Sequence, residues 1–111
     1  MSSAEEGFRR LTIGDPSMVA ALAGNASRQH EVQCLDARTE ALLRISTLIA
    51  LDAPPTSYRT AVAAALLAGA RLDDLLAVLL AVAGEVGSAR VVSAAPRIAL
   101  AAGYDVEAAL E

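Results

Sequence analysis

The sequence predicts an all-α protein, a compact bundle of about five to six helices. Alanine and leucine, both strong helix formers, supply more than a third of its 111 residues. Apolar residues recur at helical spacing, and no segment alternates with the period of a strand. Glycines and prolines stand mainly between these segments, where they end helices. The length suits one ordinary domain.

The N-terminal segment differs from the rest of the chain. Residues 1–14 are polar, and they contain Gly7 and Gly14 as helix breakers. We therefore expect an irregular, mobile N-terminal arm over 1–14 and a single helical domain over 15–111.

Two helices with acidic caps open this domain. The first helix covers about 16–23. Asp15 can accept hydrogen bonds from the free N–H groups at its start, and Pro16 suits the first helical position. Asp36 caps the second, over about 37–52, whose apolar residues form one stripe.

Two strongly apolar helices follow. The first covers about 56–68 and ends at Gly69, and the second covers about 73–83 and starts with Asp73 and Asp74. Both are apolar on every face, so they must be covered all round. A domain of this size buries only about 60 to 65% of its surface by itself. We therefore expect self-association.

Two C-terminal helices complete the prediction. Ser88 can cap a helix over about 89–102, in which Pro96 should cause a kink because it lacks a backbone N–H. Asp105 can cap a short final helix over about 106–110.

Composition excludes several classes of partner. The net charge is −4, the nine basic residues are all arginines scattered along the chain, and only three residues are aromatic. Nucleic-acid binding favours a basic face, often with aromatic side chains. The longest uncharged stretch has twelve residues, too few to span a membrane, and the first ten residues lack the apolar run of a secretory signal. We expect a cytoplasmic protein with no nucleic-acid or membrane partner.

His30 and Cys34 are the only histidine and the only cysteine. Two ligands without a third are a weak metal signal, and one cysteine excludes an internal disulfide. A nucleophilic thiol with His30 as its base is an alternative, while a small, partly buried thiol is the default. We expect neither a metal nor a cofactor.

The order and spacing of three segments resemble the carboxymuconolactone decarboxylase and alkylhydroperoxidase D-like superfamily. Leu35–Leu43 is similar to the opening helix, and Ala64–Leu75 to the family's helix, glycine, short turn and acidic helix start. Gly87–Ala94, followed by Arg97 and Ile98, is similar to the glycine-led final helix. The resemblance implies an alkylhydroperoxidase D-like helical fold that assembles as a trimer or a hexamer.

The sequence departs from this family at the catalytic positions. The peroxidase branch carries two cysteines and a histidine at places that hold Pro54, Ser57 and Ala61 here, counted back from Gly69. Hydroperoxide reduction needs two thiols, and the decarboxylase branch keeps the histidine as an acid or base. The resemblance therefore implies the fold without the activities.

Glu85 and Glu40 are the candidate catalytic residues. Glu85 follows an uncharged run, 75–84, and a carboxylate beside apolar walls would have a raised pKa. Alternatively, Glu85 lies in a glycine turn and faces water or pairs with Arg90. Glu40 matches an acidic position of the family's proton relay. Its alternative role is a surface pair with Arg44, four residues on.

Tyr58, Arg59 and Arg90 are the candidate substrate-binding residues. Tyr58 and Arg59 begin the helix that bears the family's catalytic histidine, so they could line a pocket mouth and bind a carboxylate. Ordinary surface residues at a helix start are the alternative.

Four functions are compatible with these features. The first is a catalytically divergent or non-catalytic family member, an oligomer whose pocket binds a small organic acid. The second is a decarboxylase or lactone-processing lyase that uses Glu85 and Glu40 with an arginine. A peroxidase-like antioxidant protein is favoured less than the lyase, because Cys34 is misplaced. A helix-mediated adaptor for another protein is the fourth.

Overall fold

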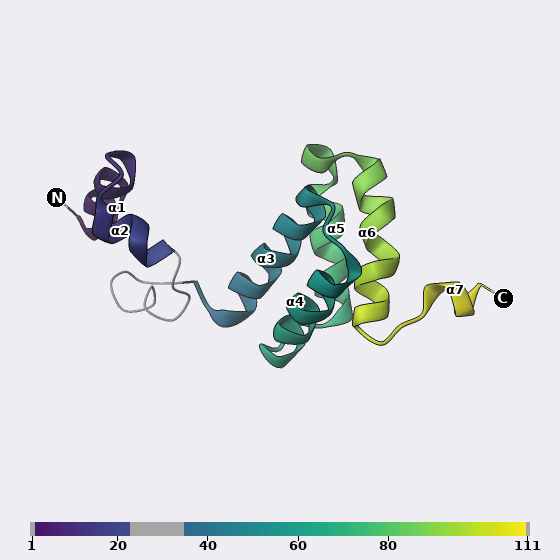
Figure 1. Cartoon of the computed structure of the whole chain (residues 1–111). Coiled ribbons are helices and arrows are strands. Elements are labelled where there is room, and N and C mark those ends of the chain that lie inside the picture. The colour runs from purple at the N-terminus through teal and green to yellow at the C-terminus, as the bar shows by residue number, and fades with distance from the viewer. Residues whose placement is uncertain (1, 23–34, 111) are drawn as a thin grey trace. The chain divides into compact units, whose positions relative to one another are not determined.

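The computed structural model describes residues 2–22 and 35–110, and every regular element in them is a helix. The prediction of an all-α protein is therefore confirmed for this part of the chain. The chain divides into two units, Met1–Leu35 and Asp36–Glu111. Its helices are Ser3–Thr12 (α1), Pro16–Leu22 (α2), Ala37–Leu51 (α3), Pro55–Leu67 (α4), Leu72–Val86 (α5), Ser88–Ala101 (α6) and Val106–Ala109 (α7) (Figure 1).

The first unit contains α1 and α2. The expectation of an irregular segment over 1–14 is wrong, because a capping box starts α1: the Glu5 N–H donates to Ser2 Oγ at 3.1 Å, and the Ser2 N–H donates to Glu5 Oε1 at 3.3 Å. Gly7 lies inside this helix. The boundary between the units also falls after Leu35, so α2 belongs with α1 and not with the later helices.

Asp15 caps α2 as predicted. Its Oδ1 accepts from the backbone N–H groups of Ser17 and Met18, both at 3.0 Å, and from Ser17 Oγ at 2.6 Å. Arg10 Nη2 lies 3.4 Å from the same oxygen and 2.8 Å from Ser17 Oγ. These hydrogen bonds, that of the Ser17 hydroxyl foremost, lower the pKa of Asp15 to about 2.

The second unit is a bundle in which α3, α4, α5 and α6 pack together (Figure 1). Each helix sends one row of side chains, spaced three or four residues apart, into a shared core. These rows are Ala41, Ile45 and Ile49 from α3, Tyr58, Val62 and Ala65 from α4, Leu75 and Leu79 from α5, and Ala94 and Ile98 from α6.

Local signals set most helix ends of the bundle. Asp36 Oδ1 accepts from the Thr39 N–H at 2.7 Å, which confirms the predicted cap of α3. Gly69, with φ +96°, follows α4 in a backbone region that favours glycine. The prediction that Ser88 caps α6 is wrong, because Ser88 is already the first helical residue and Gly87 is the N-cap.

One face of α5 remains uncovered within the unit. Leu72, Leu76 and Leu80 are spaced four residues apart and are 51, 55 and 67% exposed, respectively. We call these three side chains the α5 leucine row. Among the described residues, no helix combines the length and the apolar character that crossing a bilayer would require.

Candidate functional site

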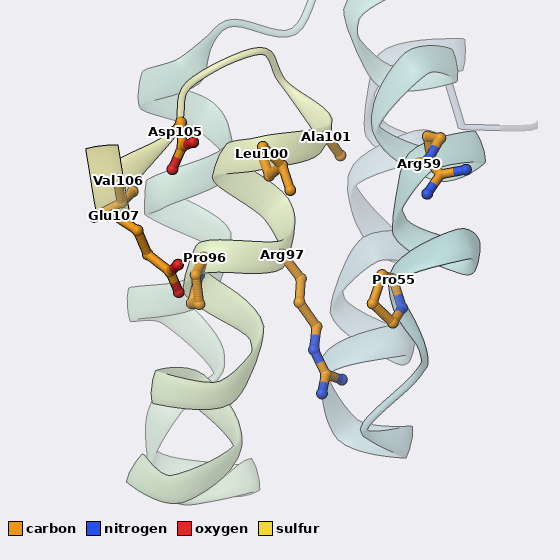
Figure 2. Close-up of a pocket in the computed structure, with 9 residues that line it drawn as sticks. All are labelled: Pro55, Arg59, Pro96, Arg97, Leu100, Ala101, Asp105, Val106 and Glu107. Carbon is orange, nitrogen blue, oxygen red and sulfur yellow. The ribbon is translucent and has the colours of Figure 1, made fainter. Parts of the chain in front are cut away.

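A pocket of about 620 Å³ lies between α4, α6 and α7 (Figure 2). Helix α6 forms its floor, α4 forms one wall, and α7 with the residue before it forms the other. The lining residues are Pro55, Arg59, Pro96, Arg97, Leu100, Ala101, Asp105, Val106 and Glu107.

The helical register of α6 supplies the floor. Ala94 and Ile98 point into the core, so Arg97, Leu100 and Ala101 lie on the side facing the pocket. Leu100 is 63% exposed, so this side of α6 presents an apolar side chain to solvent beside Arg97.

Arg97 is held by the end of α3. Its Nη1 donates to the Ala53 carbonyl at 2.8 Å and lies 3.7 Å from Asp52 Oδ1. Ser93 Oγ also donates to Asp52 Oδ1, at 3.2 Å. Since Arg97 is engaged in this network, its first role is to join α6 to the turn after α3.

Arg59 is the less constrained cation of the pocket. It lies on the exposed side of α4, one turn after Pro55, and it lines the pocket on the α4 side (Figure 2). No ion pair or side-chain hydrogen bond joins Arg59 to any other described residue. Its five N–H donors are therefore available to a ligand.

Two carboxylates stand on the opposite wall. Asp105 caps α7, because its Oδ1 accepts from the Ala108 N–H at 3.1 Å. Glu107 is exposed and has no partner among the described residues. The pocket therefore carries arginines on one side and carboxylates on the other.

The structure places the candidate catalytic residues away from this pocket. Glu40 lies on α3, and its Oε2 is 3.9 Å from Arg44 Nη2, as the surface alternative predicted. Glu85 is exposed in the last turn of α5. The expected glycine turn is wrong, because Gly84 and Glu85 are both helical. Neither glutamate lines the pocket.

Tyr58 lies in the core of the bundle. Its side chain is fully buried and does not line the pocket, so neither the predicted place at a pocket mouth nor the alternative of a surface residue describes it. Its hydroxyl has no hydrogen-bond partner in the described part of the chain. Burial raises the pKa of Tyr58, which keeps the phenol neutral.

Arg90 also has a structural position. Its Nη1 donates to the carbonyl of Ala50. Ala50 is among the last four residues of α3, and the carbonyls of the last four residues of a helix have no partner within the helix. Arg90 is therefore bound to α3 rather than to Glu85, and it lies outside the pocket lining.

Residues 2–22 and 35–110 contain no group of three or more histidines, cysteines or carboxylates that could hold a metal. His30 and Cys34 lie outside the described residues, so the alternatives for this pair stay predictions.

Comparison with known proteins gives no relative for this chain. It matches no family model, no curated protein and no solved structure.

Proposed function

We propose that the chain is a non-catalytic, divergent member of the carboxymuconolactone decarboxylase and alkylhydroperoxidase D-like superfamily. In this proposal it works as an oligomer and binds a small organic acid in the pocket between α4, α6 and α7.

The site chemistry supports a loss of catalysis. The positions of the family's two cysteines and histidine are occupied here by Pro54, Ser57 and Ala61. None of these side chains can form a thiolate, and none has an imidazole that could act as an acid or base. The two remaining candidates, Glu40 and Glu85, lie outside the pocket. No observation therefore favours the lyase or the peroxidase.

The position of Arg59 is the observation that supports the proposed ligand class. Its guanidinium has no partner among the described residues, and it lines a pocket whose floor includes Pro96 and Leu100. A carboxylate can accept two parallel hydrogen bonds from one guanidinium, while the apolar body of the acid covers Leu100. Ligand pockets typically combine an apolar lining with a few such polar groups.

The α5 leucine row supports self-association with a second copy of the chain. It is a continuous aliphatic face whose neighbours on the exposed side include Ala77 and Ala81, and no charge interrupts it between Leu76 and Leu80. In a hexamer with two-fold axes, two copies would bury the same row on both sides, whereas in a cyclic trimer the row of each copy would pack against a different face of the next copy. Such burial stabilises the assembly by about 25 cal/mol for each Å² of apolar surface that is removed from water.

The ligand is tested by titrating hexanoate into isotopically labelled protein and following chemical shifts. We expect saturable shifts in α4 and α6, and an affinity about tenfold weaker in Arg59→Gln, because a charge-assisted hydrogen bond contributes about 1.5–3 kcal/mol. Arg44→Gln is the matched control, since Arg44 is also an exposed arginine but lies on α3. Equal affinity in Arg59→Gln and wild type would reject the site.

The oligomer is tested by native mass spectrometry of the purified chain. A trimer or hexamer is the expected species. A stable monomer at micromolar concentration would overturn this part of the proposal.

A further inference from the structure

We infer that the pocket selects a zwitterion whose carboxylate and ammonium stand at opposite ends of an apolar stem. This inference rests on the proposed function, because Arg59 receives the carboxylate in both. It adds a second recognition element, the carboxylates of Asp105 and Glu107.

The two signs of charge lie on opposite sides of α6. Arg59 and Glu107 lie on opposite sides of the pocket, with Leu100 between them (Figure 2). No ion pair joins them, and Glu107 has no other partner in the described part of the chain. Each wall therefore presents a charge that no other residue of 2–22 or 35–110 neutralises.

This arrangement disfavours a simple acid. A carboxylate held at Arg59 leaves Glu107 unpaired and adds a like charge to a pocket that already holds Asp105. An ammonium group at the far end of the ligand would be attracted by the carboxylates of the same wall. The negative wall thus discriminates between two ligands that interact equally with Arg59.

The floor sets the spacing between the two ligand charges. Pro96 and Leu100 give an apolar surface between the arginine wall and the acidic wall, and Val106 adds to it at the acidic end. A chain of methylenes can cover this surface, at about 0.8 kcal/mol for each group removed from water. An α-amino acid carries its ammonium and carboxylate groups on the same carbon, so it holds the two charges much closer together than a chain with an amino group at its far end does.

Four small probes separate these contributions. They are 6-aminohexanoate, its isomer 2-aminohexanoate, hexanoate, which lacks the ammonium, and hexylamine, which lacks the carboxylate. We expect 6-aminohexanoate to bind at least about threefold more tightly than each of the other three, in chemical-shift titrations at low salt.

Two substitutions test which side chains cause the preference for 6-aminohexanoate. Glu107→Gln is expected to abolish the advantage of 6-aminohexanoate over hexanoate, while Arg59→Gln weakens both acids. Asp73→Asn is the control, because it removes an exposed carboxylate on α5 that does not line the pocket. Unchanged amide spectra outside α7 would show that Glu107→Gln keeps the fold.

Three results would overturn the inference, and they differ in what they leave standing. If hexanoate binds as tightly as 6-aminohexanoate, the zwitterion preference is wrong but the organic-acid site stands. If the two amino acid isomers bind equally, the separation of charges is wrong. If no probe with a carboxylate binds, the proposed function fails as well.

Discussion

The guanidinium of Arg97 donates to the backbone carbonyl of Ala53 at 2.8 Å, and this contact ties the middle of α6 to the turn between α3 and α4. Ala53 is only 7% exposed, so few other partners can reach this residue. One side chain therefore joins two distant parts of the bundle and lines the pocket at the same time.

Replacing Arg97 should lower the stability of the bundle. In Arg97→Gln the Ala53 carbonyl loses its donor, and we expect the free energy of unfolding to fall by about 1–3 kcal/mol. Urea denaturation followed by circular dichroism measures this change. Arg59 lies in the same pocket and pairs with no other residue that the structure describes, so Arg59→Gln should change this free energy by less than about 0.5 kcal/mol. Equal effects of the two substitutions would contradict the structural role of Arg97.

Removing the Tyr58 hydroxyl should not destabilise the protein. The hydroxyl is buried and has no hydrogen-bond partner among the described residues, so Tyr58→Phe keeps the packing and removes a desolvated polar group. We expect an unchanged unfolding free energy or a gain of up to about 1 kcal/mol. Tyr58→Ala, which leaves a cavity, should cost about 3–5 kcal/mol. A loss of more than about 1 kcal/mol in Tyr58→Phe would mean that the hydroxyl has a partner in solution.

The α1–α2 unit should keep its cap in acid. The pKa of Asp15 is about 2 in the folded chain against an ordinary value of 3.8, so its stabilising effect is present above pH 3.8 and is lost as the pH falls through 2. Carbon-13 detection of the Asp15 carboxyl should give a midpoint near 2. Ser17→Ala removes the largest cause of the shift and should move the midpoint towards 3.8. An Asp15 midpoint that is the same in both proteins would refute this origin.

Polar substitutions in the α5 leucine row should weaken the oligomer without unfolding the chain. Leu76→Gln with Leu80→Gln removes two exposed aliphatic groups, and native mass spectrometry should then show smaller species at unchanged helicity. Val92→Gln is the control, because Val92 is 71% exposed on α6 and lies outside the row. The same oligomer in the double variant and the control would show that the row is not the interface.

The sequence predicts the helices well where their signals are local. Caps such as Asp15 and Asp36 act within three residues, so their effect can be deduced without knowledge of the fold. Helix α1 differs from the prediction because Gly7 lies inside it and does not end it. A glycine costs a helix only about 1 kcal/mol, and the Ser2–Glu5 capping box opposes that cost.

The site is less predictable than the helices. Of the candidate residues, Arg59 lines the pocket, whereas Arg97 and Glu107 were not identified because the pocket brings together residues up to 52 positions apart. Sequence spacing within one helix carries no information on such contacts. The burial of Tyr58 can be predicted from the sequence, since Tyr58, Val62 and Ala65 have the spacing of one buried helix face.

The two arginines of α6 that bind the end of α3 also fix how these helices slide past each other. Arg90 reaches Ala50 and Arg97 reaches Ala53, so the two contacts are about two helical turns apart on α6. A shift of α6 by one turn would break both contacts. The pocket floor is therefore held in one register, so a ligand of the proposed class would bind without a rearrangement of α6.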